Sequence, residues 1–346
     1  MNILSLFDGI SCGQIALNKN RIKIDNYYAS EIEPSAIKIT QKNYPNTIQI
    51  GDITKISYKK GILYTENGSF KVGTIDMILG GSPCSNFSSI GYANGMSAGS
   101  IEILTLNQYI ELKNKNTKFD GQSYLFWEYV RLLKEIKPKY FLLENVVMAK
   151  KWENIITKNI GVSPIKINSS LLSAQNRPRL YWTNIENVTI PIDKKIKIEK
   201  ILDKNANKKD VTYTKTVKKS LPKLIDKYGY IPSKFNAYNV AEIKDKACAL
   251  SRGSMITSSC ATLLFVKDEN GIHTIKDGLM NEEYKVNLKD GKYNIRKLNL
   301  LEMERLQTLP DNYTKIEGVS DQKRSQAIGN GWTVNVISHI LSFIKI

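Results

Sequence analysis

Residues 75–84 read IDMILGGSPC, an apolar run that ends in two glycines, a proline and a cysteine. The run Ile75–Leu79 has the length and composition of a short buried parallel strand. In doubly wound sheets, ligands bind at the carboxyl ends of the strands, and Pro83, with its fixed φ, delivers the Cys84 thiol to that edge. Cys84 is therefore a candidate nucleophile. The alternative is common, since a lone cysteine beside a strand is more often a small buried hydrophobe.

The composition fits a globular protein with a polyanionic partner. The 346 residues are 42% hydrophobic and 24% charged, which is ordinary for a globular chain with one large core or two domains. The formal net charge of +17 is not ordinary. Nucleic acid is the first partner to consider, because phosphate contacts from Lys and Arg dominate such affinities. The alternative is a lysine-rich but merely solvated surface.

Cysteine and histidine usage argues against a metal site. The four cysteines contain no CxxC pair, and the chain has only two histidines. We therefore expect no zinc and a reducing compartment. No signal sequence or bilayer-length apolar segment is recognised, so we expect a cytoplasmic protein without a membrane partner.

The first residues predict the opening of a nucleotide-binding α/β unit. A strand at 3–6 leads into the turn 7–13, which contains Gly9 and Gly13, and then into a helix at 14–17. The turn lacks the GxGxxG spacing that closes on a pyrophosphate. A nucleoside cofactor without phosphates is therefore favoured over NAD or FAD.

Two further strand ends carry carboxylates. The strand 27–30 ends at Glu31, about 20 residues beyond the turn, where an acidic residue of a Rossmann-like unit receives ribose hydroxyls. A surface carboxylate is the equal alternative for Glu31. After the strand 48–50, Asp52 is placed to accept from an adenine amine and Ile53 to cover the ring.

The rest of the chain predicts alternating elements. Apolar periodicity, turn residues and caps predict helices at 34–43, 123–136 and 298–309, a hairpin at 57–72 with Asn67-Gly68 at its turn, a strand at 140–143, and a final helix after 329–334. Residues 86–121 lack a clear pattern. We expect a long irregular loop there, and loops of this length are more often functional than idle.

A carboxylate and two arginines accompany the candidate thiol. Glu144 follows the strand 140–143, at the strand edge where Cys84 is expected. A thiol and a carboxyl that converge on one crevice indicate a reaction site. Arg177 and Arg179 flank Pro178 in an extended segment and could clamp a carbonyl or phosphate oxygen. A surface basic pair is the alternative.

Residues 185–294 differ in character. They contain lysine-rich blocks, followed by the Ser- and Thr-rich segment 251–262. We expect a smaller second domain whose basic, hydroxyl-rich face contacts a phosphate backbone, although lysine blocks usually mark a solvated face.

Taken together, these motifs resemble the cytosine carbon-5 DNA methyltransferase family, of bacterial or phage type, over most of the chain. The motifs that carry the resemblance are 7–9, Glu31, 52–53, 83–84, 144–146, 175–179, 296–310 and 329–334. It implies an α/β fold: a mostly parallel, Rossmann-like S-adenosylmethionine-dependent methyltransferase sheet, with an antiparallel strand near one edge and a smaller, irregular target recognition domain. The implied catalytic domain comprises 1–184 and 295–346, and the recognition domain 185–294. Ser11 and Asn299 depart from the usual glycine and threonine.

The resemblance also implies the site residues. The catalytic residues would be Cys84, Glu144, Arg177 and Arg179. S-adenosylmethionine would be held by Phe7, Asp8, Gly9, Ile10, Gly13, Glu31, Ile32, Asp52, Ile53, Pro83, Leu125, Asn330, Gly331 and Trp332. Double-stranded DNA would be contacted by Ser85, Asn86, Ser88, Gln175, Arg252 and Ser254. No metal is implied, and the family usually acts as monomers.

The implied reaction is methylation of cytosine carbon 5 through a covalent Cys84 adduct, in restriction-modification or phage DNA protection. A stacked base is out of reach, so the target must be flipped out of the duplex, and we expect the loop 85–121 to close over it. A tRNA cytosine-5 methyltransferase and a catalytically inactive DNA-binding specificity protein are the alternatives. A nicotinamide oxidoreductase is disfavoured by the missing GxGxxG.

Overall fold

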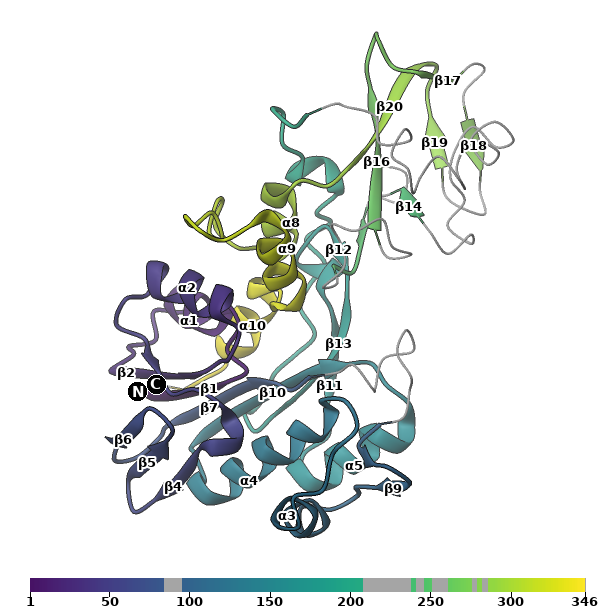
Figure 1. Cartoon of the computed structure of the whole chain (residues 1–346). Helices are drawn as coiled ribbons and strands as arrows, with labels where there is room; N and C mark the ends of the chain where they lie inside the picture. The colour runs from purple at the N-terminus through teal and green to yellow at the C-terminus, as the bar shows by residue number, and fades with distance from the viewer. Residues whose placement is uncertain are drawn as a thin grey trace. The chain divides into compact units, whose positions relative to one another are not determined.

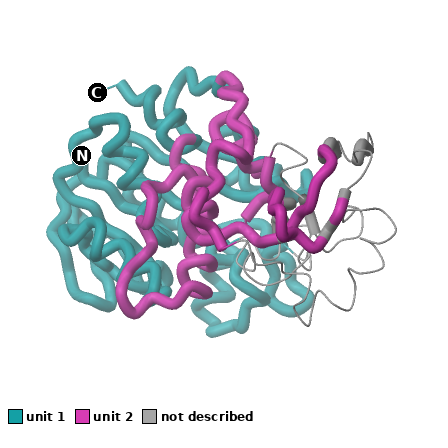
Figure 2. Tube along the Cα trace, turned by 90° about the horizontal axis from the view of Figure 1, so that it is seen from above, with its two compact units in different colours: residues 1–167, 178–191, 336–346 teal, residues 168–177, 192–335 magenta. Residues whose placement is uncertain are grey.

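The computed structural model describes residues 1–83, 95–207, 238–240, 246–250, 261–275, 279–281 and 286–345. The chain divides into two compact units (Figure 2). Unit 1 comprises residues 1–167, 178–191 and 336–346, and unit 2 comprises 168–177 and 192–335. Residues 295–335, predicted to belong to the catalytic domain, are thus part of compact unit 2. The functional division at 184 and 294 remains a prediction.

Unit 1 is built on a seven-stranded sheet with the order β11-β13-β10-β7-β1-β2-β3. Its strands, in chain order, are β1 (Asn2–Leu6), β2 (Asn26–Ser30), β3 (Ile48–Gln49), β7 (Met77–Gly81), β10 (Tyr140–Val146), β11 (Ile165–Asn168) and β13 (Pro178–Thr183). The β1, β2, β3, β7 and β10 pairs are parallel, whereas β13 is antiparallel to β10. The predicted mostly parallel α/β sheet with an antiparallel strand near one edge is confirmed.

The register brings the carboxyl ends of four strands to one edge. Leu6 is paired with both Ser30 of β2 and Gly80 of β7, and Gly81 is paired with Glu144 of β10. The residues that follow β1, β2 and β7 therefore emerge beside one another. This is the edge at which ligands of open α/β sheets bind.

Helices cover both faces of the sheet. Figure 1 shows α1 (Cys12–Lys19), α2 (Pro34–Asn43) and α10 (Val334–Leu341) over one face, and α3 (Leu106–Asn114), α4 (Phe126–Ile136) and α5 (Lys150–Ile160) over the other. The predicted helix at 34–43 has the bounds of α2, and the helix predicted at 123–136 consists of the 3-10 turn η2 (Ser123–Leu125) and α4.

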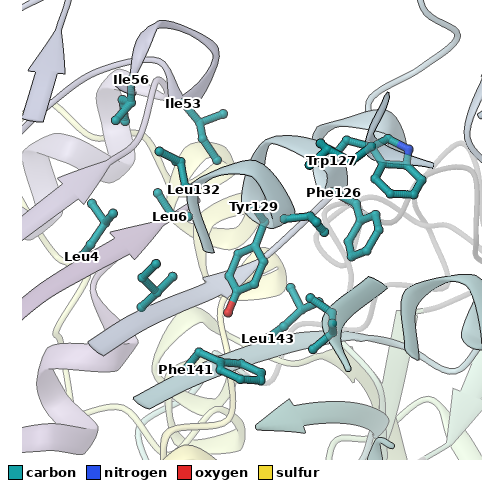
Figure 3. Close-up of a cluster of buried hydrophobic side chains, with 14 of the residues drawn as sticks. Leu4, Leu6, Ile53, Ile56, Phe126, Trp127, Tyr129, Leu132, Phe141 and Leu143 are labelled. Atoms are coloured by element: carbon teal, nitrogen blue, oxygen red, sulfur yellow. The ribbon is translucent and has the colours of Figure 1, made fainter. Parts of the chain in front are cut away.

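The core between α4 and the sheet is densely apolar. Figure 3 shows Phe126, Tyr129 and Leu132 of α4 in one cluster with Leu6 of β1 and Leu143 of β10. All five side chains are fully buried. Burying each such side chain contributes about 1.5–3 kcal/mol, so this cluster fixes the strands whose ends form the edge described above.

The prediction of an irregular loop is wrong for residues 95–121. They form a small hairpin, β8 (Ser97–Ala98) and β9 (Ile101–Glu102), and then helix α3. A capping box starts α3: Gln108 N donates to Thr105 Oγ1 at 3.2 Å, and Thr105 N donates to Gln108 Oε1 at 3.1 Å. The helix is weakly amphipathic, so its apolar spacing gave little signal, but Thr105-x-x-Gln108 is a helix start. The remainder of the predicted loop, 84–94, lies outside the described residues.

The predicted hairpin at 57–72 is confirmed and has a third strand, but the predicted Asn67-Gly68 turn is wrong by one residue: Glu66 and Asn67 form the turn, and Gly68 begins the last strand. β4 (Ser57–Lys59) precedes β5 (Ile62–Thr65) and β6 (Gly68–Lys71), and all pairs are antiparallel. The 3-10 turn η1 (Ile53–Lys55) joins this small sheet to β3.

Unit 2 contains short strands and two described helices. The strands are β12 (Gln175–Asn176), β14 (Tyr238–Val240), β15 (Ala247–Cys248), β16 (Ala261–Lys267), β17 (His273–Ile275), β18 (Leu279–Asn281), β19 (Val286–Leu288) and β20 (Gly291–Lys297); the helical elements are η3 (Ser169–Leu171), η4 (Ile198–Ile201), α8 (Leu300–Leu306) and α9 (Asp321–Asn330). Asn299 caps α8 with Glu302 as predicted, although the helix ends at Leu306 rather than 309. The final helix is confirmed as α10, and α9 was not predicted.

Candidate active site

The strand that leads to the candidate nucleophile is packed too tightly for a side chain at one position. A Cβ on Gly80 would lie 2.8 Å from two ring atoms of Tyr129 and 3.3 Å from the carbonyl oxygen of Leu6. Glycine therefore lets Tyr129 pack against β7. The described part of this strand and turn ends at Pro83, so Cys84 lies outside the described residues. The predicted DNA contacts also lie outside them: Ser85, Asn86, Ser88, Arg252 and Ser254.

Glu144 and Arg179 form an ion pair at the sheet edge. Arg179 Nε lies 3.0 Å from Glu144 Oε1, and the two side chains are only 15% and 12% exposed. Arg179 is in register with Val146, two positions from Glu144, so the pair is a diagonal contact between antiparallel strands. The structure thus brings together two residues that the sequence predicted separately.

Asn145 fastens the end of β7 to β10. Its buried amide donates to Ser82 Oγ at 3.0 Å and to the Ser82 carbonyl oxygen at 3.3 Å. No separate role was predicted for Asn145. These two hydrogen bonds hold Ser82, two residues before Cys84, against the strand that contains Glu144.

The turn after β1 adopts an unusual backbone. Phe7, Gly9 and Ser11 have φ values of 57°, 60° and 55°. Two of these are not glycine, and such conformations cost free energy that the surroundings must offset. Buried hydrogen bonds to the side chain of Asp8 supply this compensation: Tyr27 OH donates to Asp8 Oδ1 at 2.8 Å, and Ser11 Oγ donates to Asp8 Oδ2.

The carboxyl of Asp8 faces the interior. Burial raises the pKa of this carboxyl, while the hydrogen bonds from Ser11 and Tyr27 oppose that rise. A cofactor contact by Asp8 would therefore involve its backbone, and its side chain supports the turn. Ile10 is fully buried and Gly13 is buried in the first turn of α1.

Glu31 lies at the end of β2 and is held by backbone donors. Its carboxylate accepts from Gly9 N at 2.8 Å, Ile32 N at 2.7 Å and Glu33 N at 2.8 Å. The Gly9 bond connects this carboxylate to the turn after β1. Ile32 beside it is 64% exposed.

Asp52 and Ile53 stand at the third strand end. The Asp52 carboxylate caps η1 by accepting from Thr54 N at 2.8 Å, and Ile53 is buried. Leu125 ends η2 and is partly buried against the same core cluster.

A buried carboxylate that the sequence did not reveal lies behind this edge. Glu128 of α4 is fully buried, and its oxygens lie 2.5 Å from Lys113 Nζ and 2.6 Å from Arg131 Nη2. Tyr109 OH also donates to it. Burial alone would lower the pKa of Arg131, but the charges of Glu128 and Glu135 outweigh it and raise that pKa. Removing one partner of such a cluster leaves an uncompensated buried charge.

The two cations of this cluster also bind the η1 segment. Lys113 Nζ donates to the Thr54 carbonyl oxygen at 3.1 Å, and Arg131 Nη2 donates to the Ile56 carbonyl oxygen at 2.6 Å. Glu128 therefore holds η1, and with it Ile53, against α3 and α4. The spacing of Glu128 and Arg131, three apart on a helix, was the available signal.

The predicted site residues of unit 2 are mostly engaged inside that unit. Gln175 is fully buried and bonded to Leu250, Leu306 and Gln307. Arg177 is 5% exposed and donates to backbone carbonyls. Asn330 ends α9, and Gly331 and Trp332 follow it.

A polar cavity of about 440 Å³ lies in unit 1. It is lined by Ser97, Gly99, Ser100, Glu102, Asp120, Lys151 and Trp152. None of the predicted site residues lines it. In the described parts of the chain, no three His, Cys, Asp or Glu side chains are grouped to hold a metal ion. No described helix is long and apolar enough to cross a membrane.

Curated relatives are similar in sequence to this chain, some over most of its length and others over about half. The type II methyltransferase M1.ScrFI of Lactococcus lactis subsp. cremoris is 23% identical over 98% of this chain and 76% of its own length. The orphan methyltransferase M.Rho11sI of Bacillus phage rho11s is 27% identical over 56% of this chain, and the type II methyltransferase M.NgoBV of Neisseria gonorrhoeae is 30% identical over 49%. The chain spans only about a third of the length of these last two proteins, 34% and 31%.

Solved structures share the fold. The Entamoeba histolytica methyltransferase EhMeth is 16% identical with a TM-score of 0.61, and the S. pombe Dnmt2 methyltransferase is 17% identical with a TM-score of 0.60. Each comparison covers 99% of this chain and 97% of the other. The family model for C-5 cytosine-specific DNA methylase matches residues 1–345. The chain therefore belongs to the C-5 cytosine-specific DNA methylase family.

Proposed function

We propose that this protein is a DNA (cytosine-5-)-methyltransferase that acts on a cytosine flipped out of duplex DNA. One observation carries the proposal: the Glu144–Arg179 pair lies at the sheet edge where Glu144 is in register with Gly81, three residues before Cys84. An acid and a guanidinium thus stand at the strand edge from which the chain leads on to Cys84. Family membership and the net charge of +17 support a DNA substrate.

In this proposal Cys84 is the nucleophile. Its thiolate adds to carbon 6 of cytosine, and the C5=C6 electron pair moves to carbon 5 with charge spread to ring nitrogen 3. Glu144, protonated when the base is bound, shares its proton with nitrogen 3, while Arg179 holds the carbonyl oxygen of the base. Carbon 5 would then take the methyl group that the cofactor supplies, and the donor sulfur would leave as a neutral thioether. Carbon 5 next loses its proton to water, the C5=C6 double bond re-forms, and the Cys84 thiolate leaves as Glu144 recovers its proton.

The residues at the ends of β1 to β3 fit S-adenosylmethionine. When bound, this cofactor supplies an electrophilic methyl group on a sulfonium. Glu31 would receive the ribose hydroxyls, since three backbone donors fix its position and it retains acceptor capacity. Asp52 would accept from the adenine amine. Asn330, Gly331 and Trp332 remain predicted cofactor residues.

The nucleophile is tested by methyl transfer from labelled S-adenosylmethionine to duplex DNA, with tRNA as a second substrate. The wild-type chain is expected to label DNA, and Cys84→Ala to lose at least about 10³-fold in rate, as enzymes do on loss of a nucleophile. Cys84→Ala should still bind DNA and cofactor product. Transfer to tRNA alone would contradict the proposed substrate, and an active Cys84→Ala would contradict the mechanism.

Wild-type protein should also form a denaturation-resistant adduct on DNA with 5-fluorocytosine.

We further infer a role in DNA protection, either in restriction-modification or for a phage, because the relatives include type II and orphan phage methyltransferases. Bisulfite sequencing of DNA from expressing cells would give the methylated context. Resistance of that DNA to endonucleases that cut the unmethylated context would then test the role.

A further inference from the structure

The small sheet of β4, β5 and β6 has one buried face and one exposed face. Tyr58 of β4, Leu63 of β5 and Phe70 of β6 are paired across the three strands. Leu63 belongs to the core cluster of unit 1, and Tyr58 and Phe70 pack against that cluster. Successive side chains of a strand point to opposite faces, so the residues on either side of these three point outward. Figure 1 shows this sheet at the margin of unit 1.

The outward face of this sheet consists of two cross-strand rows of three residues. Their members, all exposed or half-buried, are Lys59, Ile62 and Lys71 in one row and Ser57, Tyr64 and Ser69 in the other. The Tyr64 side chain is 42% exposed. Ile62 and Tyr64 are two positions apart on the central strand, so their Cα atoms are about 7 Å apart. Lysines on both neighbouring strands flank this pair.

The charged side chains of the two rows are all lysines. Lys59 and Lys71 are exposed, as is Lys60 in the turn between β4 and β5. Among the residues that the structure describes, none is hydrogen-bonded or ion-paired to any of these three lysine side chains. Glu66 in the next turn is engaged elsewhere, since its Oε1 accepts from Asp52 N at 2.8 Å. The lysines are therefore available to an anionic partner.

An exposed ring between cations fits a strand of nucleic acid whose bases are unpaired. Such a base can stack on Tyr64 while lysines contact the phosphates on either side of it. A duplex offers its phosphates to lysines, but its base faces are already stacked on one another, so Tyr64 would have no role. The combination of ring and lysines therefore favours a single strand over a duplex.

We propose that the outward face of β4–β6 binds single-stranded DNA, with a base stacked on Tyr64 and phosphates paired with Lys59 and Lys71. The strand is DNA rather than RNA because the chain belongs to a DNA methylase family. None of the residues predicted to hold the cofactor or the target base belongs to the two rows. This binding surface therefore goes beyond the proposed methyl transfer.

The first test measures the salt dependence of strand binding by the full-length protein. The probe is a fluorescent oligothymidine of about 16 nucleotides, within the usual range of site sizes. It contains no cytosine, so it does not present the proposed target base. Each phosphate contact with a single strand contributes about 0.7 to the slope of log affinity against log salt. Lys59→Gln/Lys71→Gln should therefore reduce that slope by about 1.4 in fluorescence anisotropy.

The matched control is Lys118→Gln/Lys158→Gln, which removes two other exposed lysines of unit 1. Its slope should equal that of wild type. A wild-type protein that does not bind the oligothymidine overturns the proposal. An unchanged slope in Lys59→Gln/Lys71→Gln overturns it as well, as does an equal reduction in both double variants.

The second test isolates the ring. Tyr64→Thr removes the ring but keeps a residue that favours strands. It should weaken oligothymidine binding at least about fivefold, whereas Tyr64→Phe should stay within about twofold of wild type. Neither variant should change the affinity for the oligothymidine–oligoadenine duplex. Equal affinities of Tyr64→Thr and Tyr64→Phe for the strand, or equal losses on strand and duplex, would contradict stacking on Tyr64.

Two further measurements decide the kind of strand and the independence of the surface. Tighter binding of an oligouridine of the same length, with the same dependence on Tyr64, would overturn the assignment to DNA. Methyl transfer to duplex DNA should be unchanged in Tyr64→Thr. Wild-type protein that binds the strand through Tyr64 but transfers no methyl group would refute the proposed enzyme alone.

Discussion

Asp8 shows how a single buried side chain supports a strained turn. Its carboxyl receives hydroxyl donors from Ser11 and Tyr27 beneath a turn with three positive φ values. Gly9 in that turn donates to Glu31. The position of the proposed ribose ligand therefore depends on a residue that does not itself face the ligand.

The raised pKa of Asp8 predicts a pH dependence of stability. Burial raises this pKa above its ordinary value of 3.8, so the folded protein holds the proton at pH values where the unfolded chain releases it. The stabilisation is complete below pH 3.8 and is lost as the pH rises through the folded pKa. Wild type should therefore lose stability relative to Asp8→Asn as the pH is raised from about 4 to 8, measured by urea unfolding.

Asp25→Asn is the control of opposite sign. The Met1 amino group, by a hydrogen bond and by its charge, lowers the pKa of Asp25, so this stabilisation is lost as the pH falls. Equal pH slopes for the two variants would contradict the account of Asp8.

Individual site residues were predictable where they follow an apolar strand. Glu31 directly follows β2, Asp52 lies three residues beyond β3, and Glu144 lies in β10 in register with the last residue of β7. Their placement at one sheet edge follows from the parallel order. Glu128 was not predictable in the same way. It lies in a helix whose other buried residues are apolar, and its partner Lys113 comes from a helix that the sequence analysis did not identify.

Elements differ in how much local signal they carry. The strands β1, β2, β7 and β10 were predicted because buried parallel strands are nearly continuous apolar runs. Helix α3 was missed because it buries only Leu106 and Tyr109 along its own length. The start of α3 is set by the Thr105–Gln108 capping box rather than by regularly spaced apolar residues.

The capping box predicts a local loss of stability. Thr105→Ala removes the oxygen that accepts from Gln108 N, which costs about 1 kcal/mol at a helix start. Hydrogen exchange of the α3 amides should accelerate by roughly fivefold, with a much smaller change in α4. Ser100→Ala, an exposed serine in the preceding turn, is the control and should leave the exchange of α3 unchanged. Uniform acceleration across all helices would count against a local effect.

At the scale of the whole molecule, we expect the excess of 50 Lys and Arg over 33 Asp and Glu to govern the proposed binding to DNA. Each phosphate that the protein neutralises releases counterions, so affinity falls steeply with salt. The dissociation constant for duplex DNA, measured by fluorescence anisotropy, should rise at least about tenfold between roughly 50 and 200 mM salt. Binding of S-adenosylhomocysteine alone should change far less over the same range. A salt-independent DNA affinity would contradict an electrostatic role for the charge.

The return of the chain to unit 1 has a consequence for protein synthesis. Residues from Val336 on belong to unit 1, where Asn20 Nδ2 donates to the Ser338 carbonyl oxygen at 2.9 Å and Tyr140 OH to that of Lys345 at 3.1 Å. A ribosome makes about 5–20 residues per second, so the sheet must wait for the whole of unit 2 to be translated before its last helix can dock. We therefore expect a nascent chain stalled inside unit 2 to lack the hydrogen bonds of Asn20 and Tyr140 to the last residues of the chain.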